Sequence, residues 1–473
     1  MRLAKNALKW FTSKAIIMLI GFLSSIVFAR VLGAKVLGAF YLFMSLVSIL
    51  GRVGNLGIGA TIVQKLSSKE PKRYFSASVI LILITSLILS LSIFLFKKKV
   101  NLYVGGYNVW YLLVLVLFFR FLTTLGYNAL KAKKLVGRAG FIKSFERITT
   151  VFFQLILIYL GFELFGMITG LIVSLLIISV SMGFIVDLKL KKPSRRHLKE
   201  VVRFTSFSWI DGFVGAGQRW IDLFLIGSLS TGSSAAGVYG ITWAISENVN
   251  FSGAIGQSIL PEISDYHYKN KKKKIARVVK DSLAYLPIII LPVFFGSLIL
   301  SKDILGTIYG PKFENGWLVL IILLLSMVFI TLSVSPSQFF YGVSKPEKVF
   351  KVDAIATLLN ILIGAPLLYY YGIIGVAVGT LASSLIMCFF LMYILKKELG
   401  SVFPIKKWIK EVISSSMMLV FVFVLTKFLN TSNIYYLLTT VLLGGMIYFT
   451  ILLYIDRDIY KLAKKIFIGL IEK

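Results

Sequence analysis

Apolar runs of 18 or more residues recur from one end of the chain to the other, separated by short basic or glycine-containing connectors. Each run is long enough to cross a hydrocarbon core of about 30 Å as a helix. The runs do not alternate apolar and polar residues as the strands of a membrane barrel do. Because 58% of the 473 residues are hydrophobic and only 15% are charged, the sequence predicts an all-α polytopic membrane protein.

Fourteen spans are expected, at residues 14–31, 37–63, 74–96, 107–130, 141–162, 164–187, 204–227, 236–260, 281–300, 315–341, 352–371, 373–395, 411–429 and 433–454. With the N-terminus inside, 40 of the 52 Lys and Arg residues fall in inner segments, 8 in outer loops and 4 within spans. This bias predicts a multi-pass protein of the cell membrane with both termini cytoplasmic. It also attributes the net charge of +32 to loops that face anionic membrane lipids, and not to nucleic acid.

Two pairs of segments indicate an internal repeat: GMITGLIVSLL (166–176) matches GVAVGTLASSL (375–385), and GAFY (38–41) matches GVYG (237–240). The offset corresponds to six spans, which predicts two six-helix lobes related by a pseudo-two-fold axis along the membrane normal. The alternative is that glycine-spaced helices look alike because small residues help helices to pack. The expected divisions are an N-terminal lobe (1–187), a cytoplasmic linker (188–203), a C-terminal lobe (204–395), and two last helices with the tail (396–473).

Three arginines lie inside spans of the first lobe, where a charge costs on the order of 3 kcal/mol. Arg52 is near the middle of span two, with Asn55 and Gly59 on the same helical face. A cavity lined by arginines suits a phosphate or another anion, because guanidinium forks onto oxyanions. The alternative is that each arginine pairs with a neighbouring helix and only stabilises the lobe.

The other two arginines follow the same pattern. Arg120 is near the middle of span four, with Tyr127 seven residues later, and Arg147 lies in span five, with Gln154 seven residues later. Glu146 is adjacent to Arg147 but points elsewhere on the helix. Arg52, Arg120, Arg147, Asn55 and Tyr127 are therefore the predicted substrate-binding residues.

Span seven carries the opposite charge. Asp211, Gln218 and Asp222 share one helical face, and Arg219 is three residues before Asp222, close enough to pair with it. Span eight adds Glu247 and Asn250. These acids either pair with the arginines across the seam between the lobes or bind a coupling cation, sodium or a proton. A purely structural Arg219–Asp222 pair is the third possibility.

Enzyme chemistry is not expected. The sequence has no P-loop, no metal-ligand spacing and no paired-carboxylate site. The two histidines, His197 and His267, lie in basic segments and are expected to be solvated, and the single Cys388 excludes an intrachain disulfide. We therefore predict no cofactor and no metal.

Several motifs resemble, in the right order, those of the polysaccharide exporter family, whose members include the O-antigen and teichoic-acid flippases of the multidrug/oligosaccharidyl-lipid/polysaccharide superfamily. The matching stretches are ARVLGAKVLGAFYLFMSLVSIL (29–50), DLFLIG (222–227), AAGVYGITWAI (235–245), LPEIS (260–264), IYGPKFENG (308–316) and LLNILIGAPLLYYYGIIGVAVGTLASSL (358–385). Two departures are Gly379, where the family more often has alanine, and Asp222, which lacks the arginine that commonly follows it.

The resemblance implies fourteen helices in two lobes, plus a final pair. It also implies that the chain moves a lipid-linked oligosaccharide, carried on a polyprenyl phosphate or pyrophosphate, from the inner to the outer leaflet. Other polysaccharide-assembly proteins are possible partners. A multidrug–cation antiporter of the same superfamily and a membrane polysaccharide polymerase are the alternatives; short outer loops count against the polymerase.

The stretch FARVLGAKVLGAFY marks the outer turn between spans one and two. Gly33 and Gly38 are expected to let the chain reverse there. Arg30 lies where the outer gate of the first lobe should close, so we predict that it is a gate or headgroup contact. The alternative is an interfacial arginine that only ends a helix.

Overall fold

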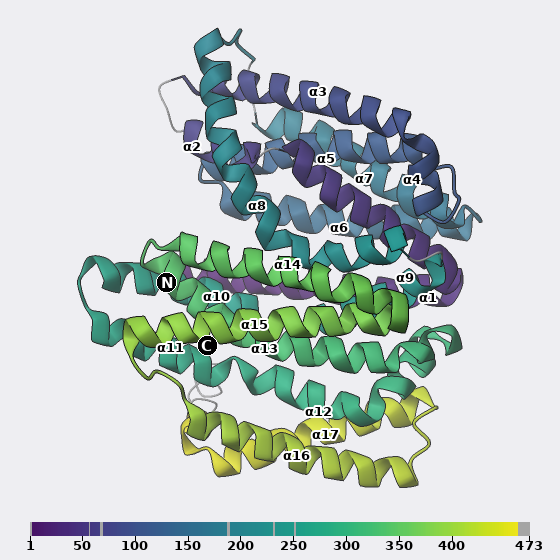
Figure 1. The fold of residues 1–473 in the computed structure, drawn as a ribbon, viewed down its shortest axis with the longest axis vertical. Helices are drawn as coiled ribbons and strands as arrows, with labels where there is room; N and C mark the ends of the chain where they lie inside the picture. Colours follow the sequence, from purple (N-terminus) through teal and green to yellow (C-terminus); the bar gives the residue numbers. More distant parts are fainter. Residues whose placement is uncertain are drawn as a thin grey trace. The chain divides into compact units, whose positions relative to one another are not determined.

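The computed structural model describes residues 2–55, 57–66, 70–186, 190–229, 232–249 and 252–461. Within them it gives the backbone but not the side chains of residues 2–18, 60, 136, 204–219, 254 and 257. The described chain is built of helices and contains no strand (Figure 1). Ten of its helical segments are long and apolar enough to cross a membrane. The prediction of an all-α polytopic membrane protein is confirmed.

Each of the fourteen predicted spans overlaps a described helix. Five of them are not separate apolar segments, for physical reasons. Spans one and two merge into a single bent helix, span five carries too much charge, and span eight is interrupted between Asn248 and Ser252. Span seven retains only a short apolar part, at Trp220–Leu229.

Contacts divide the chain into two compact units, residues 1–240 and 241–473. The first unit contains α1 to α8 and the beginning of α9. The bounds of its helices are α1 Arg2–Asn55, α2 Ile58–Lys65, α3 Pro71–Leu95, α4 Lys97–Tyr103, α5 Trp110–Ala132, α6 Val136–Tyr159, α7 Glu163–Val186, α8 Arg195–Leu229 and α9 Ser233–Asn248. Its apolar core is formed mainly by α1, α3, α5 and α7.

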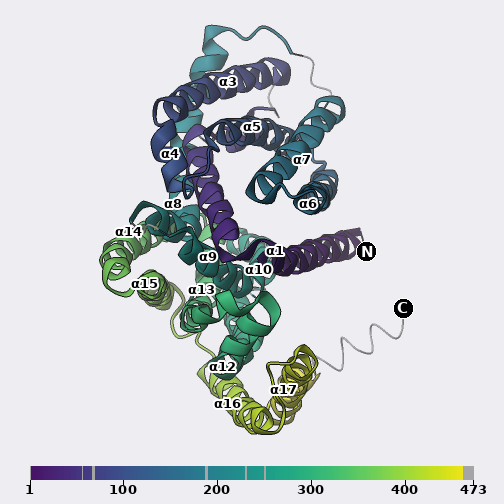
Figure 2. The same ribbon diagram turned by 90° about the vertical axis from the view of Figure 1, so that its right-hand side faces the viewer.

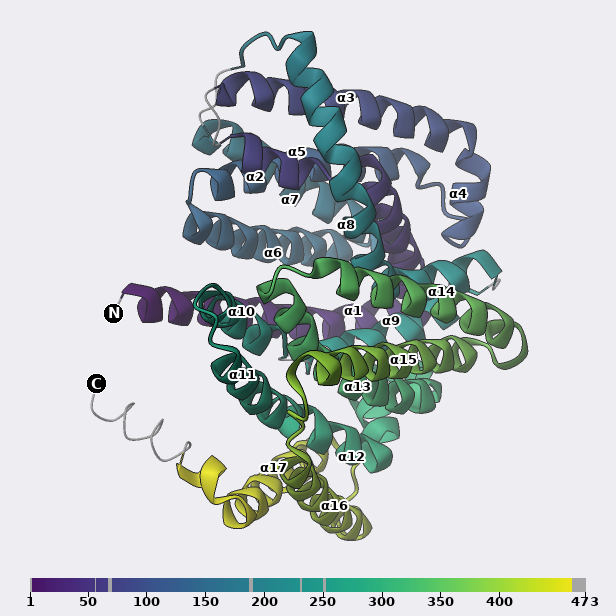
Figure 3. The ribbon, with the colours of Figure 1, turned by 60° about the vertical axis from the view of Figure 1, so that its left-hand side comes forward.

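Helix α1 is bent where the outer turn was expected. Gly33 has φ 69° and ψ 177°, a conformation that only glycine adopts readily, and it divides α1 into two arms that run in different directions (Figures 1 and 3). The second break comes earlier than predicted: α1 ends at Asn55, Gly57 is left-handed with φ 77°, and α2 begins at Ile58. Span two is therefore not one continuous helix.

The second unit contains α10 to α17 and has two apolar cores, one among α10, α11 and α13 to α15 and one among α12, α16 and α17. The bounds are α10 Ser252–Tyr268, α11 Lys272–Tyr285, α12 Pro287–Asp303, a π-helical turn Ile304–Tyr309, a 3₁₀ turn Pro311–Gly316, α13 Trp317–Gly342, α14 Pro346–Tyr371, α15 Ile373–Leu399, α16 Ile405–Phe428 and α17 Ile434–Ile455.

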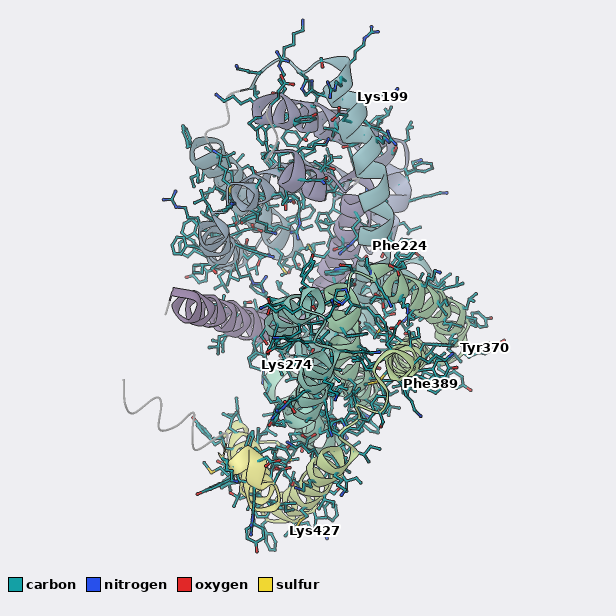
Figure 4. All side chains as sticks on the ribbon, turned by 90° about the vertical axis from the view of Figure 1, so that its left-hand side faces the viewer. Lys199, Phe224, Lys274, Tyr370, Phe389 and Lys427 are labelled. Carbon is teal, nitrogen blue, oxygen red and sulfur yellow. The ribbon has the colours of Figure 1, made fainter. Side chains whose placement is uncertain are left out.

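Aromatic side chains cover the outside of the α14–α15 hairpin. Tyr370 and Phe389 point away from the helices (Figure 4) and are 75% and 66% exposed. Such surfaces are expected on helices that face lipid, where aromatic residues gather at the membrane interface. Lipid contact therefore explains the exposed apolar surface of this hairpin.

The two predicted repeat segments make the same contact in their own units. In the first unit, Gly170 on α7 leaves no room for a Cβ against the backbone of Gln154 on α6, which would lie 2.7 Å away. In the second unit, a Cβ added to Gly379 on α15 would lie 2.8 Å from the Cα of Gly364 on α14, which also leaves no room. Each G-x-x-x-G thus brings two helix backbones close together. Gly379 also has a packing reason to differ from the alanine of the resembling family.

Candidate functional site

The second arm of α1 meets the start of α9 through glycines. A Cβ on Gly38 would lie 1.6 Å from the carbonyl oxygen of Ser233, and one on Gly237 would lie 2.0 Å from the carbonyl oxygen of Ala34. A Cβ on Gly240 would collide with the Tyr41 ring at 2.2 Å. These glycines belong to GAFY and GVYG. Gly38 contacts the residue four positions before Gly237, and Gly237 contacts the residue four positions before Gly38, so the pattern is the same from either segment. A local two-fold relation requires this property.

This geometry corrects one expectation. Gly38 does not help the chain to reverse, because it lies inside a regular helix and serves close packing against α9. Gly33 alone forms the bend. Arg30 is exposed and sits three residues before that bend, at the end of the first arm of α1.

Arg52 and Arg120 lie at the same level of two neighbouring helices. In the last turn of α1, Gly51 faces Leu117 on α5 at 3.6 Å, and Gly54 faces Phe121 at 2.6 Å, both measured from an ideal Cβ. Arg52 is half-buried on α1, and Arg120 is exposed on α5. The structure therefore brings these two predicted residues to one part of the first unit.

The residues predicted to accompany Arg52 are arranged differently from expectation. Asn55 is the last residue of α1 and is half-buried. Gly59 is not on the same helical face, because the chain breaks at Gly57 and Gly59 belongs to α2. There it packs against Asn128 on α5, whose Nδ2 would lie 2.7 Å from an added Cβ.

Tyr127 connects α5 to α6. Its hydroxyl donates to Glu146 Oε2 at 2.6 Å, and Arg120, on the same helix, is close enough to act on it electrostatically. The acid beside Arg147 is thus a partner of Tyr127. This hydrogen bond therefore joins α6 to α5.

Arg147 and Gln154 on α6 have different surroundings. The guanidinium of Arg147 lies against Gly21 in the first arm of α1, 3.2 Å from the position of an added Cβ. Gln154 is buried and donates through Nε2 to the carbonyl oxygen of Met167 at 2.9 Å. Gln154 is therefore a structural tie between α6 and α7.

Asp222 is fully buried on α8, and its Oδ2 accepts a hydrogen bond of 2.6 Å from the Tyr239 hydroxyl of α9. A tyrosine from the next helix is thus a partner of Asp222. Glu247 is half-buried and lies in the last turn of α9, so it is not mid-helix as predicted. The side chains of Asp211, Gln218 and Arg219 on α8, and residue Asn250, lie outside the described part of the chain.

A polar cluster that the sequence did not reveal joins α8 to the α2–α3 connection. Glu200 accepts hydrogen bonds from Tyr74 at 2.6 Å and from Lys65 and Arg196 at 2.9 Å each. These donors, the tyrosine first, lower the pKa of Glu200 to about 2. The cluster fixes the start of α8 to the first unit.

His197 belongs to the same cluster and corrects a prediction. It is only 3% exposed, not solvated. Its Nε2 is 2.8 Å from Glu70 Oε2, and its Nδ1 is 2.6 Å from Ser194 Oγ. Lys199 points outward from the same turn of α8 (Figure 4). Spacing along one helix gives no sign of this cluster, since Lys65, Glu70 and Tyr74 come from the α2–α3 connection.

Comparison with known proteins identifies the family. The family described as "Polysaccharide biosynthesis protein" matches residues 27–318, more than half of the chain. The chain belongs to this polysaccharide biosynthesis family. The resemblance found in the sequence motifs is thereby confirmed, and it covers both the arginine-bearing helices and the glycine contact of α1 with α9.

The chain is similar to two known proteins over most of its length. It is 28% identical over 386 residues to a probable low-salt glycan biosynthesis flippase, Agl15, of Haloferax volcanii, with 81% of each protein covered. It is 22% identical over 449 residues to a probable flippase, AglR, of the same organism, with 93% of each covered. These relatives are named as flippases and not as enzymes, in agreement with the sequence prediction.

Two solved structures share the fold. A lipid II flippase MurJ in an inward closed conformation matches with a TM-score of 0.80 and 18% identity, covering 95% of this chain and 99% of that one. An inward-facing multidrug resistance MATE family transporter of the MOP superfamily matches with a TM-score of 0.64 and 18% identity, covering 83% and 98%. The chain therefore has the fold of these transporters.

Proposed function

We propose that the chain is a flippase that moves a lipid-linked oligosaccharide, carried on a polyprenyl phosphate or pyrophosphate, from the inner to the outer leaflet of the cell membrane. Membership of a polysaccharide biosynthesis family and relatives named as flippases support this. The observation that supports the proposal is that Gly51 and Gly54 of α1 face Leu117 and Phe121 of α5, so that the backbones of Arg52 and Arg120 lie at a similar level of the two helices. We propose that the guanidinium groups of these two arginines contact the oxyanions of a phosphate headgroup.

The proposed mechanism is alternating access between the lobes predicted at residues 1–187 and 204–395, rocking about the linker 188–203, with both termini cytoplasmic. The headgroup enters from the inner leaflet while the polyprenyl tail stays in lipid. An inside-negative potential helps negative charge to move outward by about 2.3 kcal/mol per charge per 100 mV. Sodium or protons are candidate coupling ions, and Asp222 and Glu247 are candidate residues for them. Other polysaccharide-assembly proteins are proposed to receive the product.

The contact of α1 with α9 is proposed as the closed outer gate. In the predicted topology, the bend at Gly33 faces outward, so the backbones that meet at Gly38 and Gly237 lie close to the outer surface. Helices that touch through glycines form a thin barrier that separates without dragging large side chains. Arg30, exposed beside the bend, would then meet the headgroup as it leaves.

The experiment is a leaflet-accessibility assay with a fluorescent polyprenyl-pyrophosphate oligosaccharide in proteoliposomes. We compare the wild type with the double variant Arg52→Ala, Arg120→Ala. The matched control is Arg138→Ala, which removes an exposed arginine at the start of α6 in the same unit. We expect the double variant to lose at least about tenfold in transport rate, equal to about 1.4 kcal/mol in the barrier, and the control to retain the rate.

The outcomes separate the alternatives. Wild-type transport by the double variant, at equal membrane levels, would refute the role of the arginines. Absence of transport by folded wild type, across several headgroups and with ion gradients applied, would refute the flippase. Drug–cation antiport by the same vesicles would then be tested, with Asp222→Asn as the first variant.

A further inference from the structure

The C-terminal pair of helices, α16 and α17, packs on α12 with an apolar core of its own (Figure 2). Two polar side chains fasten the pair. Tyr448 is fully buried and donates to the Ile288 carbonyl oxygen of α12 at 2.8 Å, and Trp408 Nε1 donates to the Leu283 carbonyl oxygen of α11 at 2.9 Å. This three-helix assembly contains one side chain that the proposed transport mechanism does not use.

Glu411 lies on α16, six residues after the helix begins, and is 0% exposed. Neither of its carboxyl oxygens has a hydrogen-bond partner among the described residues. Ser414 and Ser415 nearby are also buried, but the Ser414 hydroxyl donates to the Lys410 carbonyl oxygen of its own helix. Glu411 is therefore a carboxyl group removed from water without a donor.

The basic residues nearest to Glu411 on its own helix are engaged elsewhere. Lys410 Nζ is 3.2 Å from Asp456 Oδ2, and Lys407 Nζ is 3.5 Å from Asp458 Oδ2. Lys407 also lies over the Tyr285 ring, 5.0 Å from its centroid. Both lysines thus point to acids at the end of α17, so that Glu411 has no ion pair in the described structure.

The charged and titratable groups around Glu411 come from its own helix, from α17 and its end, and from α11. Lys407 acts on it from its own helix and Asp456 from the end of α17. Tyr448 interacts with it electrostatically from α17. Tyr285 of α11 contacts Lys407 through its ring. Asp456 is itself 1% exposed. A second negative charge beside an unpaired buried carboxylate would make the ionised state still less favourable.

An ionised carboxylate buried without a donor or partner costs several kcal/mol, and such groups normally become neutral instead. Ionisable residues inside membrane helices are retained where they have a function. We propose that Glu411 is a proton-binding site, occupied while α16 and α17 are packed on α12. The bound ligand is a single proton, taken up by the carboxyl group with no other bond formed or broken. This inference does not rest on the proposed flippase activity.

The site gives the C-terminal pair a dependence on pH. Loss of the proton leaves a charge that the packed helices do not stabilise, so the pair becomes easier to separate from α12. The folded state then holds a proton that the unfolded chain releases at neutral pH, and stability must fall as pH rises. The effect is limited to about tenfold in the unfolding equilibrium constant per pH unit, since one proton is involved.

The direct test is infrared difference spectroscopy of the purified full chain at neutral pH, in water and in D₂O. We expect a carboxylic acid C=O band that shifts in D₂O and disappears in Glu411→Gln. The matched control is Glu398→Gln, because Glu398 is paired with Lys345 at 3.0 Å and Lys348 at 2.5 Å and should contribute no such band. Glu411→Met, similar in volume and also neutral, replaces the glutamine variant if that one does not fold.

A second variant tests the surroundings. Asp456→Asn removes the neighbouring acid and releases Lys410, and both changes favour the ionised form of Glu411. We expect the acid band to titrate away at a lower pH than in the wild type. A wild-type protein without an acid band at neutral pH would overturn the proposal. So would a band that survives in both Glu411→Gln and Glu411→Met.

Discussion

Two short segments with similar sequences lead into two long helices of the molecule. PSRRHLKEVV (193–202) leads into α8, and PIKKWIKEVI (404–413) leads into α16. Glu200 and Glu411 occupy the same position in them. Glu200 receives three donors, from Tyr74, Lys65 and Arg196, whereas Glu411 has none among the described residues.

The comparison shows that the same local sequence can hold a carboxyl group in opposite states. The ring before each glutamate plays a similar part, since His197 contacts Glu70 and Trp408 donates to the Leu283 carbonyl oxygen. What differs is the surrounding helices: Lys65 of α2 and Tyr74 of α3 donate to Glu200, and no donor reaches Glu411 among the described residues. The surroundings of each glutamate therefore depend on residues from other helices as well as on its own turn.

The same contrast is found between α6 and α14. Gln154 and Gly364 mark equivalent positions, because they face Gly170 and Gly379 in the two copies of the repeat. Counting back from them, Glu146 corresponds to Ala356, which is fully buried. The packing is duplicated, but the acid with its tyrosine donor is present only in the first copy.

The largest expected effect comes from making the second copy like the first. Ala356→Glu places a carboxyl group at a fully buried position of α14. We expect the free energy of unfolding to fall by about 3–5 kcal/mol, because the new group has no built partner and also overpacks the site. Denaturant unfolding of the purified protein measures this. The control, Ala356→Ser, adds a small hydroxyl that can bond to the carbonyl of its own helix. A loss below about 1 kcal/mol for Ala356→Glu would show that α14 already offers a donor and would break the comparison.

A smaller effect, equal in both copies, is expected at the packing glycines. Gly170→Ala and Gly379→Ala each place a methyl group against the backbone of the facing helix. Each should lower the free energy of unfolding by about 1–3 kcal/mol. Gly445→Ala on α17, where an added Cβ meets nothing within 4 Å, should instead stabilise by about 0.5–1 kcal/mol. If only one of the two repeat glycines is sensitive, the copies are not packed alike.

The sequence was sufficient for the fold because the relevant signals are local. Apolar length and small-residue spacing predicted the helices, and motif order predicted the family that the comparison identifies. The bend at Gly33 was also readable, since glycine in ARVLG interrupts two apolar runs. By contrast, Gly38 and Gly237 were mistaken for a turn residue and a repeat marker only, because their function depends on two helices touching.

The site was less predictable for a different reason. Arg52 and Arg120 could be singled out as charges in apolar helices, and the structure brings them to one level. The partners of the acids could not be predicted. Glu146 bonds to Tyr127, Asp222 bonds to Tyr239, and His197 is buried against Glu70. Each of these pairs joins separate helices, so spacing along a single helix carries no information about them.

The smallest effect sharpens the opening comparison through pH. The pKa of Glu200 falls from its ordinary 4.5 to about 2, chiefly because Tyr74 and then Lys65 and Arg196 donate to the ionised form. A group whose folded pKa is depressed adds stability above its unfolded pKa and loses it as pH falls toward the folded value. The cluster at α8 should therefore weaken between about pH 4.5 and 2.

Glu200→Gln is expected to flatten this acid side of the thermal unfolding profile and to leave the alkaline side unchanged. Glu411→Gln should do the reverse, since its proton is lost as pH rises. Unfolding midpoints measured across the pH range for the wild type and both variants check this, with Glu347→Gln in the first turn of α14 as the control. If the two variants changed the same side of the profile, the two glutamates would be in the same protonation state, and the contrast between their surroundings would have no energetic meaning.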